Sequence, residues 1–163
     1  MIQHPGGKTE KEYYMKRKII ALVLVIILAL SWAVASASSF ESRVVQLVNA
    51  ERQKNGLDPL TLDMSISNVA RLKSQDMADN NYFSHYSSTY GSAGEMMKKQ
   101  GISFSISGEN IASGQRSPEA VVAEWMHSEG HKANILSPDF SRIGVGYATN
   151  SNGTPYWTQM FTN

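Results

Sequence analysis

Residues 142–161, RIGVGYATNSNGTPYWTQMF, decide the fold class of this chain. In the first half of the stretch bulky residues alternate with small ones, mostly glycine, which is the two-residue period of a β-strand. Asn152-Gly153 is a strong signal for a hairpin turn, and residues 156–161 supply an apolar return strand. The chain is therefore expected to end in an antiparallel hairpin.

The residues before this hairpin carry the patterns of helices. Apolar side chains recur at helical spacing, and capping residues such as Asp63 and the Ser117-Pro118 pair mark helix starts. A short strand is expected near residue 109, and Gly130 is expected to end the last helix. The order of elements predicts an α+β domain with helices packed on a small antiparallel sheet. The expected helices cover residues 40–55, 63–81, 93–100 and 117–128, and Ser38 is expected to cap the first of them.

Residues 1–37 are predicted to be a leader and residues 38–163 the folded domain. Residues 16–18 are basic, and an uncharged apolar run and a segment of small residues follow them. These are the three parts of a secretory signal peptide, with cleavage expected between residues 36 and 39. The alternative is an uncleaved anchor, because the apolar segment approaches the length of a spanning helix. Either way the domain is expected to be secreted or at the cell envelope, with membrane contact only through an uncleaved leader.

The charge of the predicted domain differs from that of the whole chain. The chain has 15 basic and 14 acidic residues and a net charge of +1. Five basic and two acidic residues lie in the first 18 positions, which leaves 10 and 12 and a net charge of −2. With no basic patch, no nucleic-acid partner is expected. The chain has no cysteine, so an exported domain must be stabilised by its core.

The residues that could carry chemistry are a few histidines and carboxylates. His85, Glu109 and His131 are expected in three separate loops, and His131 follows Glu129 by two positions. Imidazole can bind a metal or move a proton near neutral pH, and a nearby carboxylate orients it. Such residues could form a divalent-metal site, although their spacing does not show that they converge. His127 is interpreted as a surface residue.

Four pieces of sequence, in this order along the chain, resemble a known family. They are YFSH (82–85), GENIA (108–112), WMHSEGHKANIL (125–136), and IGVG (143–146) with YWTQ (156–159). Together they resemble the CAP superfamily of cysteine-rich secretory proteins, antigen 5 (allergen V5/Tpx-1-related) and plant pathogenesis-related class 1 proteins. The match is closest to the bacterial SCP-like branch and spans residues 40–163. It implies a three-layer α-β-α sandwich with a central cleft.

The resemblance also implies which residues line that cleft. Family members place two histidines and two acidic residues there, and His85, Glu109 and His131 match the first histidine, the first glutamate and the second histidine. His85 and His131 are the implied metal ligands, with zinc as a candidate ion. The second acid is Glu129 or Glu124. Glu129 is ranked first because it lies beside His131, although the bacterial branch commonly has proline at that position.

The family resemblance favours a binding module over an enzyme. Related proteins are associated with lipid binding and host interaction and share no one reaction, so the expected ligand is a lipid, a peptide, an envelope component or a divalent metal. The alternative is an extracellular hydrolase in which a His–Glu pair activates water, with or without a metal. No catalytic residue is established by the sequence. Ser84, Ser87 and Ser107 lie near the motifs, but a serine nucleophile needs an adjacent base and an oxyanion site.

Overall fold

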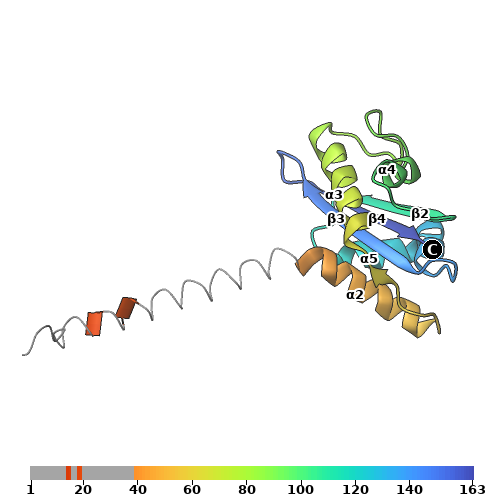
Figure 1. Ribbon diagram of the computed structural model, residues 1–163, viewed down its shortest axis with the longest axis horizontal. Helices are drawn as coiled ribbons and strands as arrows, with labels where there is room; N and C mark the ends of the chain where they lie inside the picture. Colours follow the sequence, from red (N-terminus) through yellow and green to blue (C-terminus); the bar gives the residue numbers. More distant parts are fainter. Residues whose placement is uncertain (1–13, 16–17, 20–38) are drawn as a thin grey trace, which may run out of the picture. The chain divides into compact units, whose positions relative to one another are not determined.

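The computed structural model describes residues 14–15, 18–19 and 39–163 (Figure 1). The chain divides into two units, residues 1–39 and 40–163, and every strand of the described chain lies in the second. Apart from residues 18–19, the predicted signal peptide lies outside the described residues, as do its cleavage region and the cap at Ser38. Among the described helices, none combines the length and the apolar character needed to cross a membrane.

A four-stranded sheet forms the middle of the second unit, in the order β1-β3-β4-β2. The predicted hairpin consists of β3 (Arg142–Thr149) and β4 (Pro155–Thr162), which pair antiparallel. β2 (Ser107–Ser113) adds antiparallel to the other side of β4. The two-residue strand β1 (Thr61–Leu62) was not expected, and it pairs with β3 in parallel. The sheet is therefore antiparallel except at this short edge.

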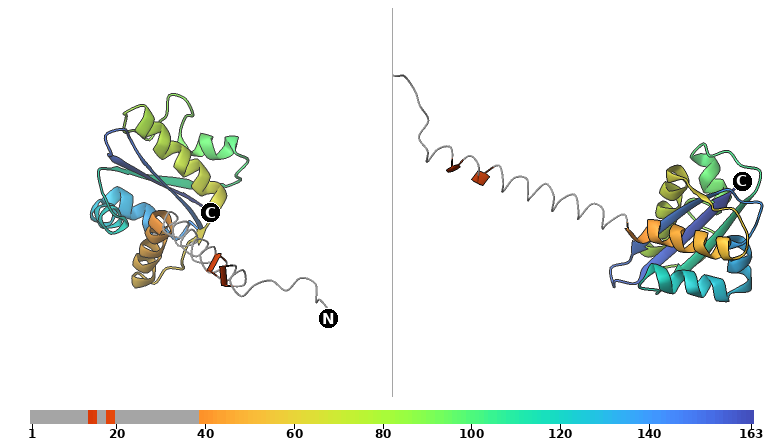
Figure 2. Two further views of the ribbon diagram at one scale, coloured as in Figure 1. Left: turned by 90° about the vertical axis from the view of Figure 1, so that its left-hand side faces the viewer. Right: turned by 90° about the horizontal axis from the view of Figure 1, so that it is seen from below.

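Helices cover both faces of the sheet (Figure 2). One face packs against α3 (Met64–Asp79) and α4 (Ala93–Lys99). The other packs against α2 (Ser39–Lys54), α5 (Pro118–His127) and α6 (Glu129–Ile135). This confirms the predicted three-layer α-β-α sandwich.

The glycines of β3 lie where helix α3 meets the sheet. A Cβ atom added at Gly144 would overlap the backbone of Ile66 and Ser67, and one at Gly146 would overlap the backbone of Ala70. The alternate residues Ile143 and Val145 are fully buried on the opposite face. The alternation in the sequence therefore reflects one bulky face and one face on which a helix backbone rests directly.

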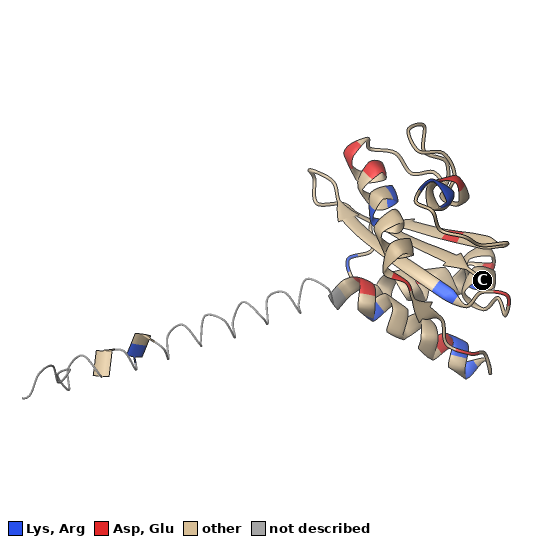
Figure 3. Cartoon of the chain, viewed as in Figure 1, with Lys and Arg blue, Asp and Glu red and all other residues tan. Residues whose placement is uncertain are grey.

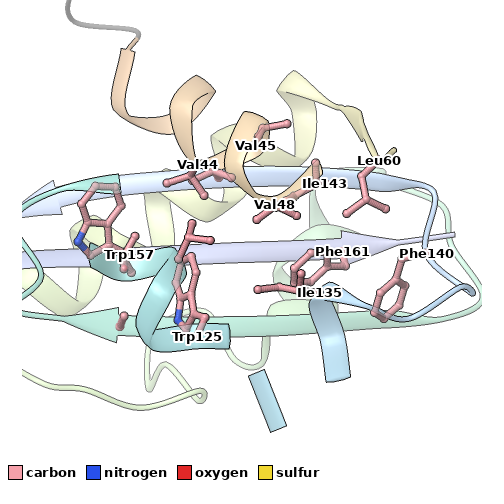
Figure 4. Packing of buried hydrophobic residues seen from close by; sticks show 14 residues of the cluster. Val44, Val45, Val48, Leu60, Trp125, Ile135, Phe140, Ile143, Trp157 and Phe161 are labelled. Atoms are coloured by element: carbon pink, nitrogen blue, oxygen red, sulfur yellow. The ribbon is translucent and has the colours of Figure 1, made fainter. Parts of the chain in front are cut away.

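The largest cluster of buried apolar side chains lies between the sheet and α2, α5 and α6. Figure 4 shows Val44 and Val48 of α2 and Trp125 of α5 over the strand residues Trp157 and Phe161. All five side chains are at most 1% exposed. Burial of this apolar surface is the main favourable contribution to the stability of a domain without disulfides.

The predicted helix break at Gly130 is wrong. The chain turns at Ser128, whose φ of −95° and ψ of 122° are extended, and α6 begins at the next residue. Gly130 lies inside α6, where an added Cβ atom would meet no atom within 4 Å. Glycine in a helix costs only about 1 kcal/mol relative to alanine, and burial of Ile135 against the core offsets that cost. His131 is therefore helical and does not lie in a loop.

Candidate functional site

The site is centred on a hydrogen bond between His85 and Glu109. His85 lies in the segment between α3 and α4, and Glu109 lies on β2, which pairs with the central strand β4. His85 Nδ1 and Glu109 Oε1 are 2.7 Å apart. The Glu109 side chain is only 7% exposed, whereas that of His85 is 62% exposed. A carboxylate fixed in the protein interior thus orients an imidazole that faces solvent.

Glu109 is a buried acid with an incomplete set of partners. Burial raises the pKa of Glu109, and the hydrogen bond with His85 and the positive charge of Lys73 oppose this increase. Its second oxygen, Oε2, is buried and has no hydrogen-bond partner among the described residues. Unpaired polar atoms of this kind are uncommon in protein interiors and often mark functional sites.

The pKa of His131 depends on its burial and on the charges of His85 and Glu124. Burial lowers the pKa of His131, the charge of His85 lowers it further, and the carboxylate of Glu124 opposes the decrease. Of the three predicted residues, His85 is hydrogen-bonded to Glu109, and its charge acts on His131. Of the two acids considered for the remaining position, Glu124 is the one whose charge acts on His131. Its side chain also accepts a hydrogen bond from Gln115 at 2.5 Å.

Buried amides hold β2 and α6 together at the site. Asn134 Nδ2 donates to the Glu109 carbonyl at 3.1 Å and to Asn110 Oδ1 at 2.8 Å. Asn110 Nδ2 in turn donates to the His131 carbonyl and to Gln159 Oε1, each at 3.1 Å. Asn134 and Gln159 therefore have hydrogen-bonding roles in the structure. These amides set the spacing of the backbones that carry Glu109 and His131.

Close packing around residue 108 explains why a glycine precedes Glu109. A Cβ atom at Gly108 would lie 2.9 Å from Phe140 Cζ and 3.1 Å from Asn134 Oδ1. A larger residue would therefore push the Asn134 amide away from β2. Glycine at position 108 therefore leaves room for the Asn134 amide beside β2.

Lys73 is part of the site, although the sequence analysis did not identify it as such. It is fully buried on α3, and its Nζ donates to the His85 carbonyl at 3.2 Å and to the Tyr82 hydroxyl at 3.4 Å. Burial lowers the pKa of Lys73, and the charges of Glu109 and Asp76 oppose this. The sequence signal for this role is a lysine at an apolar position of an amphipathic helix, because buried lysines almost always have partners.

The other candidates have local roles. His127 Nδ1 lies 2.6 Å from the Ala123 carbonyl one turn earlier in α5. Ser87 is fully buried and its Oγ accepts from the amides of Thr89 and Tyr90. Ser84 Oγ accepts from a neighbouring amide in the same way. These hydrogen bonds give the histidine and both serines a structural function.

The described side chains around the His85–Glu109 pair do not form a cluster of metal ligands. Among the described residues, no three His, Cys, Asp or Glu side chains are grouped so that they could hold a metal ion. With Nδ1 of His85 bonded to Glu109, the side chains do not present a three-ligand zinc site. The metal role of His85 and His131 therefore stays a prediction. Hollows of about 400 and 210 Å³ lie elsewhere, along α2 and along α3.

A family model and curated relatives match this chain. The model described as "Cysteine-rich secretory protein family" (CAP) matches residues 45–161. A Bacillus subtilis protein described as "Uncharacterized protein YkwD" is 57% identical over 129 residues, which is 79% of this chain and 49% of the relative. The B. subtilis "Uncharacterized membrane protein YlbC" is 38% identical over 74% of this chain and 34% of the relative. The chain thus spans half or less of the length of these relatives.

Solved structures show the same fold. An extracellular protein of Bacillus anthracis that contains an SCP domain is 34% identical, with a TM-score of 0.71 over 77% of this chain and 40% of that one. An outer surface protein of Borrelia burgdorferi has a TM-score of 0.67 over 73% of this chain and 88% of that one. At 22% identity, the second likeness concerns the fold alone.

Proposed function

This chain belongs to the CAP family of cysteine-rich secretory proteins, and we propose that it is an extracellular binding module whose ligand contacts His85, Glu109 and His131. The observation that carries the proposal is the 2.7 Å hydrogen bond between a buried carboxylate and an exposed imidazole. An extracellular location is supported by the signal-peptide pattern and by the extracellular protein of B. anthracis to which the chain is similar.

The geometry suits recognition of a polar group. When Nδ1–H of His85 donates to Glu109, the other ring nitrogen, Nε2, is an acceptor on the solvent side. When the imidazole is protonated, both nitrogens donate. The same ring can therefore hydrogen-bond to a donor group in its neutral form and to an acceptor group in its protonated form. The buried amides fix the backbones behind it. A rigid support of this kind lowers the entropy lost on binding.

A hydrolase is the second candidate, and the same pair of residues supports it. A carboxylate bonded to Nδ1 is the arrangement that orients a general-base histidine, and His131 could stabilise a developing charge. The serines closest in sequence to His85 do not support a serine nucleophile. The Ser84 and Ser87 hydroxyl oxygens accept hydrogen bonds from backbone amides of their own loop. We therefore rank the binding module first and treat hydrolysis by activated water as an outcome to be tested.

Co-sedimentation with insoluble cell walls separates these functions. The purified protein is mixed with walls of B. subtilis, the organism of the 57% identical relative. We expect it to pellet with the walls, and Glu109→Gln, which neutralises the buried acid, to lower that binding about tenfold. The matched control is Glu119→Gln on α5, an exposed carboxylate paired with Arg43.

The outcomes are distinct. Equal wall binding by Glu109→Gln and the wild type would overturn the assignment of the site, and no binding by the wild type would exclude a wall ligand. Release of soluble wall fragments by the wild type, but not by Glu109→Gln, would make the protein a hydrolase. Circular dichroism checks that both variants are folded.

A further inference from the structure

The segment that carries His85 has the composition of a recognition loop. Residues 80–92, NNYFSHYSSTYGS, connect α3 to α4 and contain no Asp, Glu, Lys or Arg. Figure 3 shows this connection without acidic or basic colouring, although both helices beside it carry charges. Ten of its 13 residues are Tyr, Ser, Asn or Gly, the residue types that dominate antibody binding loops. Such loops contact their ligands through ring surfaces and neutral hydrogen-bonding groups.

Two exposed aromatic residues flank His85 in the sequence. Phe83 is 54% exposed and Tyr86 is 62% exposed. In residues 40–163, Met64 is the one other large hydrophobic residue with more than half its surface exposed. Exposed aromatic rings beside polar groups are characteristic of binding surfaces. The rings and the imidazole together present apolar faces and a hydrogen-bonding group within four residues of sequence.

The backbone beneath the rings is held in place. Ser87 and Gly91 exchange two backbone hydrogen bonds, of 2.9 and 2.8 Å. The Lys73 ammonium donates to the His85 carbonyl, and the Tyr82 hydroxyl donates to Asp76 on α3. The rings of Phe83 and Tyr86 are thus displayed on a supported segment, which reduces the ordering cost of binding.

We propose that residues 83–86 and the Glu109-oriented imidazole bind an uncharged oligosaccharide. A pyranose ring has an apolar C–H face that packs on an aromatic ring and hydroxyl groups at its edge that hydrogen-bond to His85. An anionic polymer needs lysine or arginine to neutralise it. Residues 80–92 have none, and Lys73 and Lys99, which contact this segment, donate to its His85 and Tyr90 carbonyls. This inference rests on the proposed function, because it names the ligand class of the same site.

Titration with defined saccharides tests the proposal. The purified protein is titrated calorimetrically with chitotetraose and cellotetraose, and with a heparin tetrasaccharide as the anionic arm. We expect saturable binding of at least one neutral tetrasaccharide and weaker binding of the anionic one. Phe83→Ala and Tyr86→Ala should each weaken the affinity about tenfold, as loss of an aromatic contact at a binding site does. Met64→Ala is the matched control, because Met64 is also 54% exposed but lies at the start of α3.

Two results would overturn this inference. One is the lack of binding of either neutral saccharide, and the other is equal weakening by Phe83→Ala and Met64→Ala. Wall binding that depends on Glu109 but not on Phe83 or Tyr86 would leave the proposed function intact and reject the saccharide. Saccharide binding through the two rings that is unchanged in Glu109→Gln would support the saccharide and reject the role given to Glu109.

Discussion

At the scale of single residues, the site depends on two buried charges. Burying an isolated carboxylate is costly, and such groups usually gain a proton or a partner. One oxygen of Glu109 is hydrogen-bonded to His85, and Lys73 supplies a positive charge from α3. Lys73 in turn meets the charges of Glu109 and Asp76. Each buried group therefore favours the ionised form of the other.

Replacing Lys73 with Met tests this coupling. The change removes a positive charge that opposes the effect of burial, so we expect the pKa of Glu109, already raised by burial, to rise further. The side-chain carboxyl carbon of Glu109 can be followed by NMR as the pH is changed. The control is Lys54→Met, because Lys54 is exposed and pairs with Glu51. An unchanged titration of Glu109 in Lys73→Met would show that the two charges are not coupled.

Tyr82 gives the protein a defined sensitivity to alkaline pH. Burial, followed by the hydrogen bond to Asp76, raises the pKa of Tyr82 from 10.0 to about 12. Unfolded chains therefore release this proton at lower pH than folded ones, and the stabilisation present below pH 10 is lost between pH 10 and 12. The ring is partly exposed, so we expect a loss of about 1–2 kcal/mol. In Tyr82→Phe this part of the decrease should be absent when urea unfolding is measured across that range. A decrease of the same size in both proteins would assign it to other groups.

How far these residues could be predicted differs between them. His85, Glu109 and His131 lie in short motifs that resemble a known family. The fold places a hydrogen bond between His85 and Glu109, and the shared cleft of all three residues stays a prediction. The role of Lys73 depends on its partners: the His85 carbonyl is 12 residues away and Glu109 is on another element. A sequence pattern shows that Lys73 is on the apolar face of α3, but not which groups meet it there. Long-range hydrogen bonds and charges are set by packing, and local spacing does not encode them.

At the scale of elements, two glycines have opposite roles. Gly146 of β3 lies against the backbone of Ala70, while Gly130 of α6 faces open space. We expect Gly146→Ala to destabilise the protein by about 3 kcal/mol, because helix α3 would have to move off the sheet. Gly130→Ala should stabilise it by about 0.5–1 kcal/mol, since alanine is the better helix residue. Urea unfolding measures the change in stability of both variants. Similar changes would contradict the close packing of the α3 backbone on Gly146.

The same two positions show what a sequence pattern can indicate about elements. The alternation at residues 142–148 predicted β3 and its glycine face, because a strand period is a local property. The helix after Ser128 was missed, because a glycine in a short segment favours a break as much as a weak helix. Burial of Ile135 in the core decides between them, and that contact exists only in the assembled fold.

At the scale of the whole domain, one buried arginine joins segments that the sheet does not connect. Arg52, near the end of α2, is 2% exposed. Its Nε donates to the Asp58 carbonyl at 2.7 Å, and its Nη1 donates to the carbonyls of Ile135 and Ser137 at 2.9 and 2.7 Å. Its Nη2 reaches the carbonyl of Phe140 at 3.4 Å. The guanidinium thus connects α2, the end of α6 and the chain entering β3, as a covalent cross-link would.

Removing this connection should therefore be as damaging as removing a cross-link. In Arg52→Met, four carbonyl groups lose a donor, and those of Ile135 and Phe140 are buried. We expect a loss of about 3 kcal/mol and a decrease in Tm of about 10 °C by calorimetry. Arg52→Lys should recover part of this, because an ammonium has donors but lacks the planar fork. Arg43→Met is the control: its ion pair with Glu119 is exposed, so its effect should stay within about 0.5 kcal/mol. If Arg52→Met had the same Tm as the wild type, the apolar clusters alone would hold the layers together. The guanidinium would then only fill space between α2 and α6.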